Sequence, residues 1–317
     1  MALHRELIRY ATLAPSSHNT QCWHFESRGN VISVLPDLSR RCPAVDPDDH
    51  HLFVSLGCAA ENLVQAALAH GLAGTVNIEP ARGQAIRIAL EPTPAIASSL
   101  FAAIPRRQCT RGEFDGRPLT GEEMRLLERA GTGVGVRILL LSEKTAMEKV
   151  LEYVVAGNSA QMADKAFVAE LTTWIRFSDA EAVQKGDGLF SRATGNTVVP
   201  RWLGKLLLPV FYTNSRENEK YVNHVRSSAG LAVFVSEAND PAHWIETGRC
   251  YERFALQATA LGIHNAFLNQ PVEVSAMRPR FAEMLGVAGL RPDLVVRFGR
   301  GAEMPRSLRR PVEAVLA

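Results

Sequence analysis

The chain has 317 residues, of which 46% are hydrophobic and 21% charged, the composition of an ordinary globular protein that can bury a core. Its net charge of +2 gives no argument for binding nucleic acid or a membrane surface. The five scattered cysteines lack a CxxC pair and no apolar run has the length of a signal peptide or a membrane span, so we expect a cytoplasmic protein without a disulfide framework.

The first hundred residues predict one α/β unit. Apolar residues at helical spacing predict a short helix over residues 3–14, and Gly29-Asn30 between two alternating runs predicts a hairpin. An Ala/Leu-rich helix then ends at Gly71 and leads into a strand. A further strand is expected over residues 85–90.

The middle of the chain, residues 116–228, reads as helical at first and then as irregular. The stretch from Ser178 to Tyr212 mixes glycine, proline and aromatic residues without a clear period. Loops of this length inside a compact domain are disordered or functional. The aromatic residues, among them Phe190 and Trp202, favour an ordered covering segment.

The last third repeats the plan of the first. A buried strand over 229–237 precedes a helix within 246–269 that ends at Gly262, and a strand follows at 293–299. The two glycine-ended helices align so that Gly57 matches Gly248 and Glu61 matches Glu252. We interpret this as an internal duplication, with two unrelated α/β units as the alternative.

Common nucleotide and hydrolase motifs are missing from the sequence: no GxGxxG follows a strand, and there is no Walker A or GxSxG sequence. The histidines around Cys22 and after "DPDD" lack metal-ligand spacing, so no metal is expected. Arginines cluster at 106–111 and at 297–310, which suggests local anion sites, because a guanidinium group binds phosphate through two parallel hydrogen bonds. Taken alone, the first cluster is better interpreted as a solvated basic turn that opens a helix.

Three stretches, considered together, favour a cofactor site over a solvated turn. "APSSHNTQCW", "RRQCTRGEF" and "RFGRGAEMPRSLRRPVEAV" occur in an order that resembles the nitroreductase family of flavin proteins, and most of all its Acg-type branch, in which two nitroreductase-like halves share one chain. The resemblance implies an α+β, nitroreductase-like fold in which two similar halves form an intramolecular pseudo-dimer. Its expected parts are a first half over 1–100 and a second half over 101–317, with a lid-like insertion at about 142–228.

The resemblance also implies one FMN per chain at the seam between the halves. The phosphate and ribityl end would be held by arginine-motif residues and by the C-terminus, namely Arg106, Arg107, Gln108, Cys109, Arg111, Arg309 and Arg310. The ring and ribityl oxygens would contact Pro15, Ser16, Ser17 and Asn19, and the N5 edge would lie near Leu268, Asn269 and Gln270. Cys22 and Cys109 depart from the family pattern, and the thiol at 109 implies a looser phosphate grip.

The implied function is an FMN-dependent oxidoreductase that passes hydride from NAD(P)H to a nitroaromatic or quinone-like acceptor. The flavin carries the chemistry, so no catalytic acid or base is assigned. The alternatives are an FMN storage protein whose lid excludes substrates, and an α/β ligand-binding protein without flavin. The expected partners are FMN, NAD(P)H and a small aromatic acceptor, with no nucleic acid and no membrane, and either a monomer or a homodimer is compatible.

Overall fold

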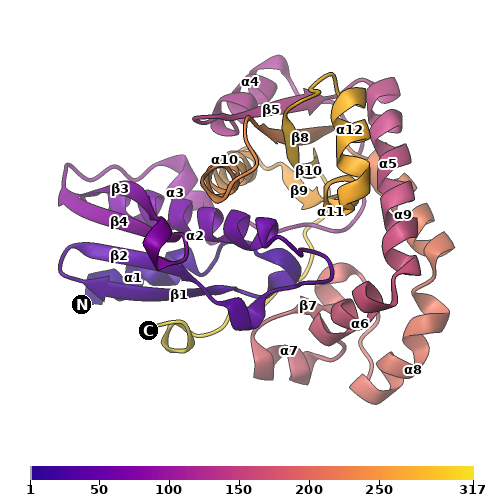
Figure 1. Ribbon diagram of the computed structural model, residues 1–317, viewed down its shortest axis with the longest axis horizontal. Helices are drawn as coiled ribbons and strands as arrows, with labels where there is room; N and C mark the ends of the chain where they lie inside the picture. The colour runs from indigo at the N-terminus through magenta and orange to yellow at the C-terminus, as the bar shows by residue number, and fades with distance from the viewer. Residues whose placement is uncertain (1) are drawn as a thin grey trace.

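The computed structural model describes residues 2–317, except for the side chains of residues 209–211. Two four-stranded antiparallel sheets with flanking helices confirm the α+β class (Figure 1). The first sheet has the order β1-β2-β4-β3, and its strands are β1 Trp23–Arg28, β2 Val31–Pro36, β3 Leu72–Glu79 and β4 Ala85–Pro92. The second has the order β5-β8-β10-β9, and its strands are β5 Val136–Leu141, β8 Gly230–Ser236, β9 His264–Phe267 and β10 Arg291–Gly299.

The two sheets share one connectivity. In each, two antiparallel strands precede a long helix, and the strand after that helix takes the sheet edge while the last strand inserts beside the second. The long helices are α2 (His50–Ala69) and α10 (Pro241–Ala260). This equivalence is what an internal duplication requires.

Helix α2 begins before its Ala/Leu-rich run. The carboxylate of Asp46 accepts hydrogen bonds from the backbone N–H groups of His51 and Leu52, which fixes the helix start several residues upstream of Ser55. By length and mean hydropathy (1.5) this one helix could also cross a membrane, but 72% of its apolar window is buried inside the protein. It therefore has the burial of a core helix.

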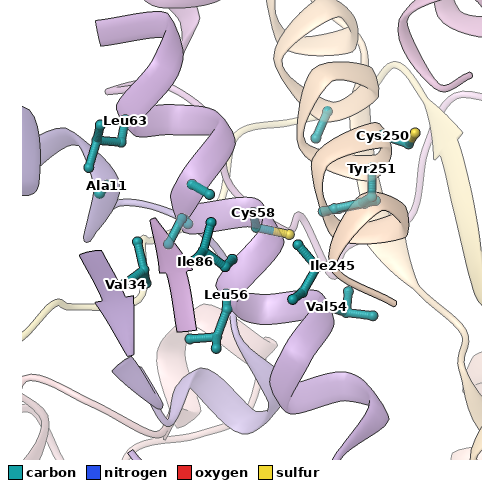
Figure 2. Packing of buried hydrophobic residues seen from close by; sticks show 14 of the residues in the cluster. Ala11, Val34, Val54, Leu56, Cys58, Leu63, Ile86, Ile245, Cys250 and Tyr251 are labelled. Carbon is teal, nitrogen blue, oxygen red and sulfur yellow. The ribbon is translucent and has the colours of Figure 1, made fainter. Parts of the chain in front are cut away.

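Helices α2 and α10 pack directly against each other at the seam between the halves (Figures 1 and 2). A Cβ atom on Gly57 would overlap the carbonyl oxygen of Ile245, and one on Gly248 would overlap that of Val54. Because 54 aligns with 245 where 57 aligns with 248, the contact is reciprocal, like the contact across a two-fold axis. Figure 2 shows Val54, Cys58 and Ile245 side by side in this core, which is continuous across both halves.

The connection from β5 to β8 is the long insertion, whereas the equivalent connection in the first half is the two-residue turn Gly29-Asn30. It contains α5 Lys144–Ala163, α6 Lys165–Trp174, β6 Ile175–Arg176, α7 Asp179–Lys185, β7 Leu189–Phe190, α8 Arg201–Phe211 and α9 Asn214–Arg226. The expectation of irregular structure from Ser178 to Tyr212 is wrong in part, because α7 and α8 lie there. Their short apolar patterns are separated by Gly186, Gly188 and Gly195, which hide the helical period.

The C-terminal tail leaves the second sheet and returns to the first (Figure 1). The backbone of Phe25 in β1 donates to Val315 O and accepts from Ala317 N. The remaining helices are α1 Ala2–Ala11, α3 Ser99–Ala103, α4 Gly121–Ala130, α11 Gln270–Glu273 and α12 Arg278–Met284, with 3-10 turns η1 Ser17–Asn19, η2 Leu38–Arg40, η3 Pro80–Arg82, η4 Ser191–Thr194, η5 Ser275–Met277 and η6 Val312–Ala314.

The glycine contact at the seam predicts a specific stability effect. Gly57→Ala forces helix α2 away from Ile245, and we expect it to lower the free energy of unfolding by about 1–3 kcal/mol or more. Gly121→Ala, at the start of α4 with only the end of Arg125 nearby, is the matched control and should be neutral or slightly stabilising. Urea denaturation of both variants measures the difference; equal stability would contradict the close packing.

Candidate functional site

A cavity of about 690 Å³ lies where the two halves and the insertion meet. Helix α2 contributes His51, Val54, Ser55 and Cys58 to its wall, the turn before β1 contributes Pro15, Ser16, Ser17 and His18, and the segment after β9 contributes Leu268, Asn269 and Gln270. The volume suits a cofactor or drug-sized ligand. The structure thus brings together the first-half turn and the 268–270 segment.

The first-half turn has an unusual backbone. His18, Asn19 and Gln21 have φ values of 47°, 54° and 54°, a left-handed region that disfavours residues with a side chain. The Oγ atom of Ser16 accepts from Gln21 N (2.8 Å), and Ser17 N donates to the hydroxyl of Ser55 on α2 (3.3 Å). These contacts hold both serines at the cavity wall.

Asn19 lies behind this wall and has a structural role. Its side-chain amide donates to Gly188 O (3.0 Å) in the insertion and to Leu308 O (3.1 Å) in the tail, and its Oδ1 accepts from Arg309 Nη1 (2.9 Å). Gln21 repeats the pattern: its amide donates to Gly186 O and its Oε1 accepts from Arg310 N, both at 2.8 Å. Asn19 therefore ties the strained turn to the two segments that cover it.

Arg107 is buried away from the described cavity lining. Its Nε lies 3.2 Å from Glu252 Oε1, with both side chains 1% exposed or less, and its Nη2 donates to Leu13 O (2.9 Å). Burial raises the pKa of Glu252 to about 7, although Arg107 opposes the shift. The pair joins the arginine motif to α10 and to the residues just before the turn.

Five other residues expected at the phosphate also lie outside the described cavity lining. Arg309 donates to Thr12 O, Leu13 O and Ala14 O, so it holds the start of the turn. Arg106 is exposed, and Cys109 pairs with Asn265 through the backbone. The other two bond to main-chain carbonyls: Gln108 to Met304, and Arg310 to Gln21 and Ala314.

Arg111 does line the cavity, together with Lys220 of α9 and Arg297 of β10. Within the described residues, the side chains of Arg111 and Lys220 make no salt bridge or hydrogen bond. Arg297 is 1% exposed, stacks on Phe114 at 4.1 Å and donates only to carbonyl oxygens, those of Thr110, Gly112 and His224. Three cations thus meet at one end of the cavity without a carboxylate bound to any of them.

The pKa shifts reflect this crowding. Burial and then Arg111 lower the pKa of Arg297 to about 9, and burial, opposed by Glu217, lowers that of Lys220. Burial together with Arg297 and Lys220 lowers the pKa of His224 to about 3, so this histidine is neutral. An anion bound here would relieve the repulsion among the cations.

The insertion supplies most of the apolar cavity wall. Its contribution includes Phe167 and Leu171 of α6, Phe177, Leu207 of α8, and Tyr221 of α9. Beside this wall, Asn269 accepts from Val295 N through Oδ1 (3.0 Å), while its Nδ2 lies 3.5 Å from His51 Nε2. The cavity is therefore cationic at one end, polar along the seam and apolar under the insertion.

Two groups of metal-type ligands occur among the described residues, and the carboxylate of each group accepts backbone hydrogen bonds. In the group of His18, Cys42 and Glu170, the carboxylate of Glu170 accepts from Ala44 N and Val45 N, and burial raises the pKa of the Cys42 thiol. In the group of Asp46, His50 and His51, the carboxylate of Asp46 caps α2. All five cysteines are free thiols.

Sequence reasoning missed Lys220, and it counted Arg297 in the second arginine cluster without assigning it to the cofactor site. Arg297 had a readable signal, because a charged residue inside the apolar strand "DLVVRFG" must be satisfied by a partner or a ligand. Lys220 had none, since "ENEKYV" reads as a solvated helix face and only the folding of the insertion places it beside Arg111.

Comparison with known proteins places the chain in a class. No family model matches it. Two curated Mycobacterium tuberculosis proteins are each 26% identical: "Putative NAD(P)H nitroreductase Rv3131", over 93% of this chain and 84% of that protein, and "Putative NAD(P)H nitroreductase acg", over 98% and 94%. The chain is a relative of these nitroreductase-like proteins, which confirms the resemblance expected from the motifs. The match to acg is consistent with the Acg-type branch.

Solved structures give weaker matches. A nitroreductase with bound FMN from Desulfitobacterium hafniense is 14% identical with a TM-score of 0.43, covering 67% of this chain and 94% of that one. The FMN-dependent nitroreductase NfnB from Mycobacterium smegmatis, in complex with NADPH, is 15% identical with a TM-score of 0.42, covering 66% and 93%. Likeness at this level carries no argument about the site.

Because Arg107 is buried, we expect its substitution to lower the stability of the protein. Arg107→Ala leaves Glu252 buried without its cation, and we expect the free energy of unfolding to fall by about 3–5 kcal/mol. Arg106→Ala, at an exposed neighbour, should change it by less than about 0.5 kcal/mol. Chemical denaturation of both variants tests this; unchanged stability in Arg107→Ala would contradict it.

Proposed function

We propose that the cavity binds FMN and that the protein is an NAD(P)H-dependent oxidoreductase of nitroreductase type. The observation that carries the proposal is the group of Arg111, Lys220 and Arg297, which forms no ion pair within the described residues, at one end of a cavity large enough for a flavin. The names of the two mycobacterial relatives support the same activity. The acceptor would be a nitroaromatic or quinone-like compound, and the expected location is the cytoplasm.

The cavity residues fit the parts of FMN. The three cations would bind the phosphate dianion, because guanidinium and ammonium groups form charge-assisted hydrogen bonds to its oxygens. Ser16 and Ser17 would face the ribityl chain and the ring from the first half, and Leu268, Asn269 and Gln270 would lie at the N5 edge. When bound, FMN would accept hydride and pass its electrons on, while the protein orients it and limits water.

The remaining residues expected at the cofactor would act indirectly. Asn19, Arg309 and Arg310 would hold the turn in its strained form, and Arg107 would anchor the arginine motif to α10. We propose that Arg106, Gln108 and Cys109 likewise support the cofactor from behind the wall. One chain would build one site, since the insertion that lines the cavity occurs in the second half alone.

A storage protein for FMN is the alternative function. The insertion lines the cavity with Phe167, Phe177 and Tyr221, and an apolar cover of this kind would exclude NAD(P)H and acceptors if it did not open. The insertion is fastened to the first half by Asn19 and Gln21 and by the ion pair of Arg40 with Asp187.

The redox behaviour of the purified protein separates these functions. We expect a yellow protein with a flavin spectrum that NADPH or NADH bleaches without oxygen and that a nitroaromatic compound or quinone restores. A flavin bleached by dithionite but not by reduced nicotinamide would favour storage. A colourless protein that takes up no FMN would contradict both functions.

The cation group predicts which residues retain the phosphate. Lys220→Ala and Arg111→Ala should each weaken FMN binding by about tenfold or more, because each removes a charge-assisted contact worth about 1.5–3 kcal/mol. Arg226→Ala, on the exposed face of the same helix as Lys220, is the matched control and should bind as the unaltered protein does. Fluorescence titration of the apoprotein with FMN and with riboflavin, which lacks the phosphate, measures the effect; an equal loss for both ligands would refute a phosphate contact.

A further inference from the structure

Helix α11 carries a carboxyl group into the cavity wall. Glu273 lines the cavity one turn after the 268–270 segment, and its backbone N–H donates to Asn269 O (2.8 Å). Its Oε2 accepts a 2.6 Å hydrogen bond from Nε2 of Gln161, a cavity residue of α5 that is 8% exposed. The carboxyl group is thus positioned through one oxygen, while Oε1 has no hydrogen-bond partner within the described residues.

The surroundings of Glu273 raise the pKa of its carboxyl group. Burial raises the pKa of this carboxyl, and the charge of Asp46 adds to the shift, while His51 and the hydrogen bond from Gln161 oppose it. His51 is itself neutral at physiological pH, because burial lowers its pKa. His51 and Asp46 act on the carboxyl, and the carboxylate form of Glu273 in turn raises the pKa of Cys42, Tyr212 and Tyr221.

The other acid–base groups of the cavity are less suited to giving up a proton. Burial lowers the pKa of His18 to about 4, which leaves it without a proton to lose as an acid near neutral pH. Burial raises the pKa of Tyr212 well above its usual value, so it holds its proton firmly. Burial raises the pKa of Glu217 as well, but this carboxyl lies near Lys220 and Arg111, two of the cations proposed to bind the phosphate, and both oppose the shift.

We propose that Glu273 is the proton donor to the acceptor during its reduction, an inference that rests on the proposed function. A quinone takes up two electrons and two protons to become a hydroquinone. Hydride from the reduced cofactor supplies both electrons and one proton, and the Oε–H group of Glu273 supplies the other to a carbonyl oxygen. The resulting carboxylate keeps its hydrogen bond to Gln161 and is reprotonated by water.

The first test compares two acceptors with the FMN-loaded protein. Glu273→Gln should keep its FMN and its rate of reduction by NADPH, because glutamine preserves the contact with Gln161. Its rate with 1,4-benzoquinone should fall about 10²-fold, within the range for loss of a general acid. Its rate with ferricyanide, which takes one electron and no proton, should not change. Glu283→Gln, at an exposed position on α12, is the control and should match the unaltered protein with both acceptors.

The second test needs no turnover. In apoprotein carrying ¹³C-labelled glutamate carboxyl groups, one NMR resonance should titrate above the usual range of glutamate, be absent in Glu273→Gln and shift in Glu273→Asp. In the unaltered enzyme the quinone rate should fall as pH rises through that titration, because the acid form is consumed, while the ferricyanide rate stays level. Glu273→Asp should restore part of the quinone rate lost in Glu273→Gln.

Each outcome decides the proposal. Equal rates of the two enzymes with quinone, equal losses with both acceptors, or a Glu273 resonance with an ordinary pKa would overturn it. If Glu273→Gln does not fold, the pH profile of the unaltered enzyme and Glu273→Asp decide in its place. Failure of the unaltered protein to bind FMN or to be bleached by NADPH refutes the proposed function instead, and is visible before any variant is made.

Discussion

The close approach of α2 and α10 is the constraint on which the rest of the structure depends. Gly57 and Gly248 let each helix backbone reach the carbonyl groups of the other, so the two sheets share one continuous core. The cavity forms at one end of this contact, where the start of α2 meets the segment after β9. A wider separation of the helices would open the seam and move the serine turn away from Asn269.

The buried cationic side chains near this seam fall into two groups. Arg107 has a carboxylate partner in Glu252 and lies behind the wall, where the pair joins the arginine motif to α10. Arg111, Lys220 and Arg297 have no such partner among the described residues and lie on the wall. Since the cost of burying a charge must be offset by a partner or a ligand, the second group supports the proposed phosphate site.

The asymmetry of the two halves gives the cavity its cover. In the first half the turn Gly29-Asn30 joins two strands directly, whereas in the second the equivalent strands are joined by the whole insertion. That insertion brings apolar side chains and Lys220 to the cavity, and Asn19 and Gln21 fasten it to the first half. The cover and one of the three cations, Lys220, therefore come from the same segment.

The sequence by itself determined the first hairpin, the glycine-ended helices and the repeated plan, because these follow from local periodicity and turn chemistry, and the resemblance of its motifs implied the α+β class. It also indicated the serine turn and Arg111 as cavity residues. Only the tertiary structure decided that Arg107 and Asn19 lie behind the cavity wall and support it. It also decided that Lys220 and Arg297 line the cavity. The physical reason is that a motif fixes which charges are present, whereas the partner of each charge depends on which distant segments fold against it.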